Sequence, residues 1–184
     1  MARSRAGLET QRRILDATTE LLAEAGLEGT TLKAICDRAE VLPGSFYNLF
    51  ETKEQAVLTV VREAIEAVDP DPERDRTDTV ADLVLAYVKF IEAQPDLARI
   101  YIQIAVSGTD ADARLGGRVR RHHHERVARF ADAYARDHAG MPEPEARRRG
   151  ELLIATLNGL ALSNLLEPRF DFRGHALHLL EDGG

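Results

Sequence analysis

Apolar residues recur at helical spacing along almost the whole chain. Between residues 8 and 25 they fall on one side of a helix, and the same period returns in later stretches that Gly, Pro and polar runs separate. No segment alternates apolar and polar residues as a half-buried strand does, and no hairpin dipeptide stands between the helical stretches. The pattern predicts an all-α protein of about nine helices.

Breaks in the pattern place the helix ends and one boundary. Gly26 is the expected stop of the first helix, and Thr52 with Gln55 predicts a capping box for the fourth. The polar, proline-broken run 69–78 is expected to be a surface loop. We expect a head over residues 1–51 and a body over residues 52–184. The expected helices cover about residues 8–25, 32–39, 43–50, 53–68, 79–93, 95–107, 110–138, 144–167 and 173–181.

The densest local pattern lies between residues 30 and 53. A short helix begins at Leu32 with Thr30 or Thr31 as its N-cap, and a tight turn follows near residues 40–42. Pro43 suits the first position of the next helix, because its missing N–H costs nothing there. Two short helices joined in this way predict a helix-turn-helix whose second helix contacts DNA.

The second helix of this motif has an apolar side and a polar side. We expect Phe46 and Phe50, with Leu49, to anchor it in the core. Ser45 and Asn48 offer both donors and acceptors, which suits them to base edges. The side chains expected to contact phosphates are Tyr47, Thr31, Lys33 and Lys53.

This stretch resembles the DNA-binding domain of the tetracycline-repressor (TetR) family. The family has, in order, a Gly, a small hydroxyl residue, an apolar residue, Tyr, two variable residues, Phe, two more residues and Lys. They stand here as Gly44, Ser45, Phe46, Tyr47, Asn48, Leu49, Phe50, Glu51, Thr52 and Lys53. The resemblance is close over about the first third of the chain and extends beyond it only in helix count and arrangement.

The resemblance implies a homodimeric, ligand-responsive transcriptional regulator, usually a repressor. Its head would be the DNA-binding domain, with Pro43 and Gly44 completing the contact set, and would bind a pseudo-palindromic double-stranded DNA operator. Its body would dimerise and bind a small apolar or amphipathic effector that releases the DNA.

Three residues depart from the family pattern. Glu40 stands where the family usually has a turn Gly, at a position where a side chain resists positive φ. Leu42 and Pro43 replace polar or basic residues, which removes donors for phosphates or bases. An alternative therefore stays open, namely a helical dimeric ligand-binding or adaptor protein that has lost sequence-specific DNA binding.

Aromatic residues in the body could line an apolar effector cavity, or they could simply fill the core. The expected ligand-binding residues are Tyr87, Phe90, Tyr101, Phe130 and Tyr134, with Asn158 as a polar orienting group.

The eighth helix carries more leucines than fit on one face, so it should be buried from more than one side. The resemblance implies that the last two helices pair with a second subunit as a four-helix bundle. The expected dimer-interface residues are Leu153, Leu157, Leu160, Leu165, Leu177 and Leu180.

Charge and composition are compatible with a DNA-binding regulator. The net charge is −7, from 24 basic and 31 acidic residues. DNA binding depends on local positive charge, which the amino end supplies through Arg3, Arg5, Arg12 and Arg13. One Cys, the lack of a leader and the lack of a long apolar run lead us to expect a cytoplasmic protein that is not in a membrane.

The chain lacks the patterns of a metal site or an enzyme. The consecutive residues His122, His123 and His124 would diverge by about 100° on a helix, so they cannot all ligate one ion, and we expect a solvated face. No nucleophile elbow, Walker motif or dinucleotide glycine pattern appears. We expect no catalytic residue, no metal and no cofactor.

Overall fold

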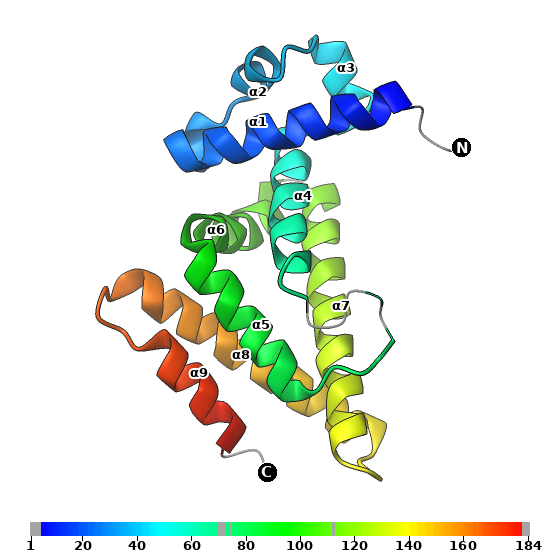
Figure 1. The fold of residues 1–184 in the computed structure, drawn as a ribbon, viewed down its shortest axis with the longest axis vertical. Coiled ribbons are helices and arrows are strands. Elements are labelled where there is room, and N and C mark those ends of the chain that lie inside the picture. The colour runs from blue at the N-terminus through cyan, green and yellow to red at the C-terminus, as the bar shows by residue number, and fades with distance from the viewer. Residues whose placement is uncertain (1–4, 70–72, 74, 112, 182–184) are drawn as a thin grey trace.

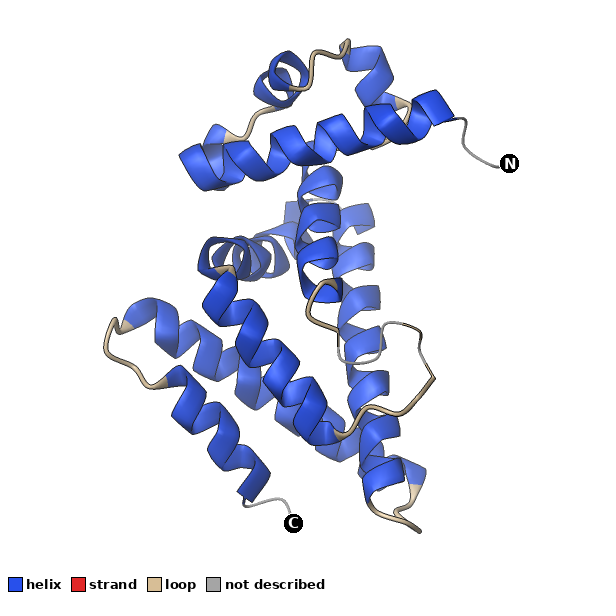
Figure 2. Ribbon diagram, in the orientation of Figure 1, coloured by secondary structure: helices blue, strands red, loops and turns tan. Residues whose placement is uncertain are grey.

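The structure is a computed structural model that describes residues 5–69, 73, 75–111 and 113–181, without the side chains of residues 105–116. Within these residues every regular element is an α-helix, which confirms the predicted fold class (Figure 2). The helices are α1 (Arg5–Gly29), α2 (Leu32–Arg38), α3 (Pro43–Tyr47), α4 (Lys53–Glu66), α5 (Val80–Ala93), α6 (Pro95–Ala111), α7 (Ala113–Asp137), α8 (Glu143–Leu166) and α9 (Phe172–Glu181). Among the described residues, no helix combines the length and apolarity that a membrane crossing needs.

Helix ends follow the local sequence signals. Gly26, with φ 66° and ψ −171°, interrupts α1, which confirms the predicted stop although one further turn reaches Gly29. The hydroxyls of Thr31, Thr52 and Thr79 each accept a hydrogen bond from the N–H three residues on. The box predicted at Thr52 is only half formed, because the Gln55 side chain accepts from the N–H of Glu51 at 2.8 Å instead of that of Thr52.

The head is built around α1, which packs against α2, α3 and the first part of α4 (Figure 1). Its core contains fully buried side chains from all four helices, including Ile14, Ile35, Phe46 and Val57. Because α4 continues from this core into the body, it is the mechanical link between the two parts.

The body is held together by the long contact between α7 and α8. Gly150 permits this close crossing, since a Cβ there would lie 3.0 Å from the carbonyl oxygen of Val127. The last helix, α9, packs on α5 and α8 (Figure 1). Its Arg173 pairs with Glu92 of α5 at 2.7 Å.

The helix α8 has a buried face and an exposed face in the single chain. Leu153 and Leu157 were expected at a dimer interface, but this placement is wrong, because they are 6% and 0% exposed in the core of the protomer. The exposed leucines are Leu152, Leu162 and Leu166, at 62%, 47% and 75%. The leucine-rich pattern therefore contains two separate faces.

The turn between α2 and α3 places a glutamate in the left-handed region. Glu40 has φ 52°, as its match to a family turn Gly indicated. The N–H of Val41 donates to the carbonyl of Cys36 at 3.0 Å, and that of Glu40 donates to Asp37 at 3.3 Å. These two bonds form a Schellman motif, which requires the positive φ and normally has Gly at this position.

We predict that Glu40→Gly stabilises the protein. Left-handed backbone costs a residue with a Cβ about 1–2 kcal/mol, and the greater freedom of Gly in the unfolded chain offsets part of the gain. The free energy of unfolding from urea titration should rise by about 0.5–1 kcal/mol. Glu40→Ala, which keeps the Cβ, is the control, and an equal gain from Ala would contradict the explanation.

Candidate nucleic-acid interface and effector pocket

The two sides of α3 differ in burial as predicted. Phe46 and Phe50 are 0% and 3% exposed, and their rings lie 5.5 Å apart, so they anchor the helix in the head core. Tyr47 is 56% exposed, and the rings of Phe46 and Tyr47 meet edge to face at 5.9 Å. Asn48 is exposed beside it. The structure thus presents a tyrosine and an amide on a rigid apolar base.

The other predicted DNA-binding residues differ in how exposed they are and in whether they already have partners within the protein. Pro43 and Gly44 are exposed, and Ser45 is half-buried. Thr31 is exposed but already accepts from the N–H of Ala34, and Lys33 pairs with Asp37, which raises the pKa of the lysine.

Lys53 has a structural role that the sequence did not indicate. Its ammonium donates to the carbonyls of Leu27 and Thr30 at 3.2 and 3.0 Å, so it ties the start of α4 to the end of α1. Contact of Lys53 with a phosphate stays a prediction.

The basic amino end is partly engaged within the head. Arg12 pairs with Asp16 at 3.0 Å, and Arg13 donates to the carbonyl of Glu40 at 3.4 Å. Arg5 is exposed, and Arg3 lies outside the described residues. Two of the four predicted arm arginines therefore also support local structure.

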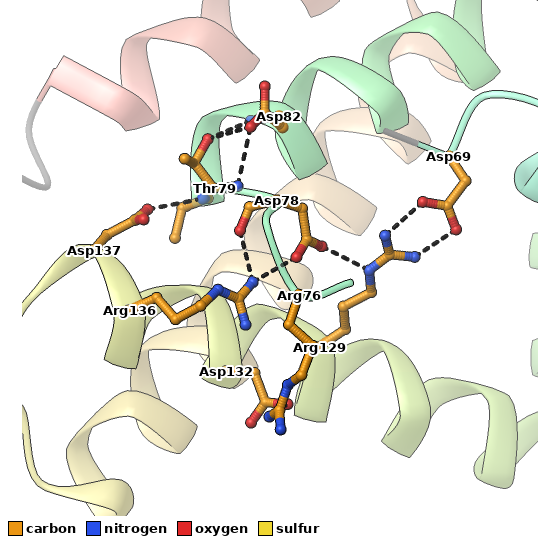
Figure 3. A network of polar contacts seen from close by, with 10 residues as sticks. Asp69, Arg76, Asp78, Thr79, Asp82, Arg129, Asp132, Arg136 and Asp137 are labelled. Carbon is orange, nitrogen blue, oxygen red and sulfur yellow. Dashed lines mark hydrogen bonds and ion pairs between the residues drawn. The ribbon is translucent and has the colours of Figure 1, made fainter. Parts of the chain in front are cut away.

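In the body, two arginines of α7 bind the segment that joins α4 to α5 (Figure 3). The Arg129 guanidinium forms a two-pronged pair with Asp69 and also donates to Asp78 at 2.8 Å. Arg136 donates to the backbone carbonyl of Asp78 at 2.6 Å. The hydrogen bond to Asp69 is the main reason that the pKa of Arg129 is raised.

The prediction that residues 69–78 form an exposed surface loop is thus wrong for Asp78, which is only 5% exposed and lies between the two arginines. Arg129 and Arg136 are seven residues apart and so share a face of α7, which is the one signal that could have indicated this contact. Residues 70–72 and 74 of the expected loop lie outside the described residues.

Hollows follow the face of α7 that looks toward α4. An apolar hollow of about 80 Å³ is lined by Ile65, Val68, Leu83, Tyr87, Phe90 and Phe130, with Arg126 at its polar side. A cleft of about 380 Å³ adjoins it and shares Ile65, Asp69, Arg126 and Arg129. A third hollow of about 230 Å³ shares Arg62, His122 and Glu125 with the cleft. Together they form a connected site that borders α4.

The structure brings four of the six predicted ligand-binding residues together. Tyr87, Phe90 and Phe130 line the apolar hollow, and the Tyr87 hydroxyl donates to the side-chain oxygen of Asn158 at 3.1 Å. Tyr101 lines the third hollow instead. 

Tyr134 lines none of these hollows. It packs beside α8, where the Arg149 guanidinium lies 6.0 Å from its ring. Its expected place in the pocket is wrong, because its ring faces Arg149 of α8, whereas the cleft continues along another face of α7 as far as Arg136.

Two polar groups of the site were missed by sequence reasoning. The Arg126 guanidinium lies 5.0 Å from the centre of the Tyr87 ring, and its Nη2 is buried without a hydrogen-bond partner among the described residues. The Nε2 of His122 is buried and unpartnered in the same way. The expected solvated face therefore holds for the exposed His123 and His124 but not for His122, which lines the cleft.

The charge state of His122 follows from its surroundings. Burial first, and then the positive charges of Arg126 and Arg62, lower the pKa of His122 to about 4. The imidazole is neutral at pH 7, so it faces the cleft as a hydrogen-bonding group without charge. Its spacing of four residues from Arg126 places both side chains on one face of α7.

Residues 14–59, which include α2, α3 and the buried anchors, match the family model of the bacterial regulatory proteins, tetR family. The match places residues 14–59, a quarter of the chain, in this family. Over 71 residues it is 31% identical to the transcriptional repressor KstR of Mycolicibacterium smegmatis, a match that covers 39% of this chain and 35% of KstR. The chain thus spans about a third of the length of the curated relatives that it matches first.

Solved structures extend the likeness to nearly the whole fold. A transcriptional regulator from Rhodococcus sp. Rha1 has a TM-score of 0.66 at 24% identity, with 92% of each chain covered. A complex of SmeT with triclosan has a TM-score of 0.59 at 26% identity, with 89% of this chain and 84% of SmeT covered. SmeT is the repressor of a multidrug efflux pump of Stenotrophomonas maltophilia.

We predict that His122 makes the protein less stable in acid. Its pKa is near 6.5 in the unfolded chain and about 4 in the folded one, so the unfolded state binds the proton more tightly. Stability from this group is complete above about pH 6.5 and is lost as the pH falls toward 4. The unfolding temperature should therefore fall less between pH 7 and pH 5 for His122→Gln than for the natural protein. The exposed His124→Gln should behave like the natural protein, and equal losses in all three would refute the assignment.

Proposed function

We propose that this protein is a ligand-responsive transcriptional repressor that binds a pseudo-palindromic operator as a cytoplasmic homodimer and has no catalytic role. The observation that carries the proposal is the outer face of α3, where the exposed Tyr47 and Asn48 stand on the buried Phe46 and Phe50 within a tetR-family head. A small recognition surface on a rigid base is what base and phosphate contacts require.

The position of α4 supports a response to a ligand. Its first residue, Lys53, is tied to α1, and residues beyond its middle, such as Ile65, line the apolar hollow and the cleft. A molecule that enters the hollow must contact α4 near the end opposite to the head. Movement of α4 would then change the separation of two heads in a dimer, which couples ligand binding to DNA binding.

The exposed face of α8 supports the homodimer. The exposed positions Leu152, Ala155, Gly159, Leu162 and Leu166 follow one another at alternating steps of three and four residues. This spacing makes a continuous apolar stripe, and its small residues allow a second helix to approach closely. Of the interface residues predicted from sequence, Leu160, Leu165, Leu177 and Leu180 are partly exposed and remain in the proposed interface.

The adaptor alternative is favoured by the entry to α3. Leu42 is 76% exposed and Pro43 is exposed, so this edge of the head offers no charged side chain to a phosphate. The start of α3 would then contact DNA only through Tyr47, Asn48 and the backbone, and positive charge would have to come from Lys33, Lys53 and the amino end. Binding of the purified protein to its own promoter region at several salt concentrations separates the two hypotheses, since only the repressor gives salt-sensitive, sequence-preferring affinity.

We predict distinct effects for Tyr47, the last residue of α3, and Asn48, its C-cap. Tyr47→Ala should weaken binding to all sequences, because it removes a phosphate contact, whereas Asn48→Ala should lower discrimination between bases by about 1–3 kcal/mol. Fluorescence anisotropy with operator and scrambled duplexes measures both. Arg120→Ala, which removes an exposed cation of the body, should change neither quantity. A uniform effect of Asn48→Ala on every duplex would contradict its assignment to a base.

We predict that Leu162→Glu converts the dimer into monomers, because it places charge in the middle of the apolar stripe. Sedimentation velocity over a range of concentrations measures the state of assembly. Leu8→Glu, at a leucine of the head that is 55% exposed, is the matched control and should remain dimeric. A dimeric Leu162→Glu protein would remove α8 from the proposed interface.

A further inference from the structure

We infer that the effector of this protein is an amphipathic carboxylic acid, with its carboxylate on Arg126 and its apolar part in the hollow between α4, α5 and α7. The inference rests on the proposed function, in that it takes the connected site in the body to be the effector site. It adds the chemical class of the ligand and the residue that selects it.

The first argument is that Arg126 differs from the other arginines of the cleft. Arg129 and Arg136 bind carboxylates of the segment after α4, Arg62 pairs with Glu66, and Arg76 pairs with Asp132. In the part of the chain that the structure describes, Arg126 forms no ion pair, and its Nη2 is buried without a partner. A buried guanidinium N–H without an acceptor is costly, so an anion that accepts from this Nη2 gains a strong, charge-assisted hydrogen bond.

The second argument is the division of the site into an apolar and a polar part. On one side of Arg126 lies the apolar hollow formed by Ile65, Val68 and Phe130 with their neighbours. On the other side lies the cleft, where the unpartnered Nε2 of His122 can donate to a second oxygen when it carries the ring proton. A ligand that satisfies both parts has an anionic end and an apolar end.

The third argument limits the charge of the ligand to one. Asp69, Glu66 and Glu125 line the same cleft, and the neutral His122 adds no positive charge. The other four arginines of the cleft pair with Glu66, Asp69, Asp78 and Asp132, so among the described residues Arg126 and Glu125 are the two charged groups of the cleft without an ion pair. A single negative charge is matched by Arg126, whereas the second charge of a phosphate ester would find no further unpaired cation among the described residues of the cleft and would face Glu125. These conditions favour a carboxylate.

The site also connects the carboxylate to the head. Arg126 and Arg129 lie three residues apart on α7, and Arg129 holds Asp69, which follows the end of α4. A carboxylate on Arg126 brings negative charge close to the carboxylate of Asp69 and weakens the hold of Arg129 on it. Ligand binding thus loosens the body end of α4, the helix that carries the head.

The test compares acids with neutral molecules of the same shape. Hexanoate, octanoate and 4-phenylbutyrate, with the corresponding primary amides and alcohols and with octyl phosphate, are titrated into the full chain by calorimetry. Each acid should bind at least about tenfold more tightly than its amide, because the amide oxygen can still accept from Arg126 but lacks the negative charge that strengthens this hydrogen bond. Octyl phosphate should bind more weakly than octanoate.

Variants then assign the preference to one residue. Arg126→Gln should remove the tenfold preference for acids, Arg126→Lys should retain most of it, and the exposed Arg120→Gln should leave it unchanged. The comparison of acid with amide on the natural protein needs no variant, so it decides the point even if a variant fails to fold.

Several outcomes would overturn the inference. They are the binding of no acid, equal binding of acids and amides, tighter binding of octyl phosphate, or an acid preference that survives in Arg126→Gln. DNA binding of the unliganded protein is measured separately by anisotropy. A protein that prefers acids but binds no duplex would overturn the proposed repressor while leaving the ligand class intact. A protein that binds its operator duplex but shows no preference for acids would overturn the ligand class while leaving the proposed repressor intact.

Discussion

The bridge from Arg129 to Asp69 and Asp78 is the interaction that fixes the segment after α4 against α7 (Figure 3). It joins the segment after α4 to α7, and so determines where α4 lies relative to the hollows. Asp78 is nearly fully buried, so loss of Arg129 would leave its carboxylate with Arg136 as its remaining ion-pair partner among the described residues. Because the Asp78 side chain is only 3% exposed, its carboxylate depends on these two arginines for compensation of its charge, and the bridge constrains where the segment lies against α7.

The head achieves its geometry by a different means. Its recognition helix is only five residues long, too short to be stable alone, and it is held by the packing of Phe46 and Phe50. The turn before it is closed by a Schellman motif in which Glu40 accepts left-handed backbone. The head therefore accepts local strain at Glu40 in order to orient Tyr47 and Asn48.

Sequence patterns described the helices well because helix formation is governed by local signals. The Thr caps, Gly26 and the helical spacing of apolar residues act within a few neighbours, and they placed most helix ends within a few residues. These local signals could not predict which face of a helix packs against a neighbouring helix. On α8 the leucines could not be divided into a core face and an exposed face, because that division depends on where α7 packs, and Leu153 and Leu157 were assigned to the wrong one.

The sequence by itself determined the helical fold, the recognition helix with its aromatic anchors, and the aromatic composition of the body, since these depend on short-range spacing and residue type. Only the tertiary structure decided which polar groups line the connected hollows of the body. Arg126 is one arginine among many on α7, and it is distinguished solely by the carboxylates that bind its neighbours and not it. Those carboxylates come from a segment about 50 residues away in sequence, and the pairing of charges over such a distance is set by the packing of the whole chain.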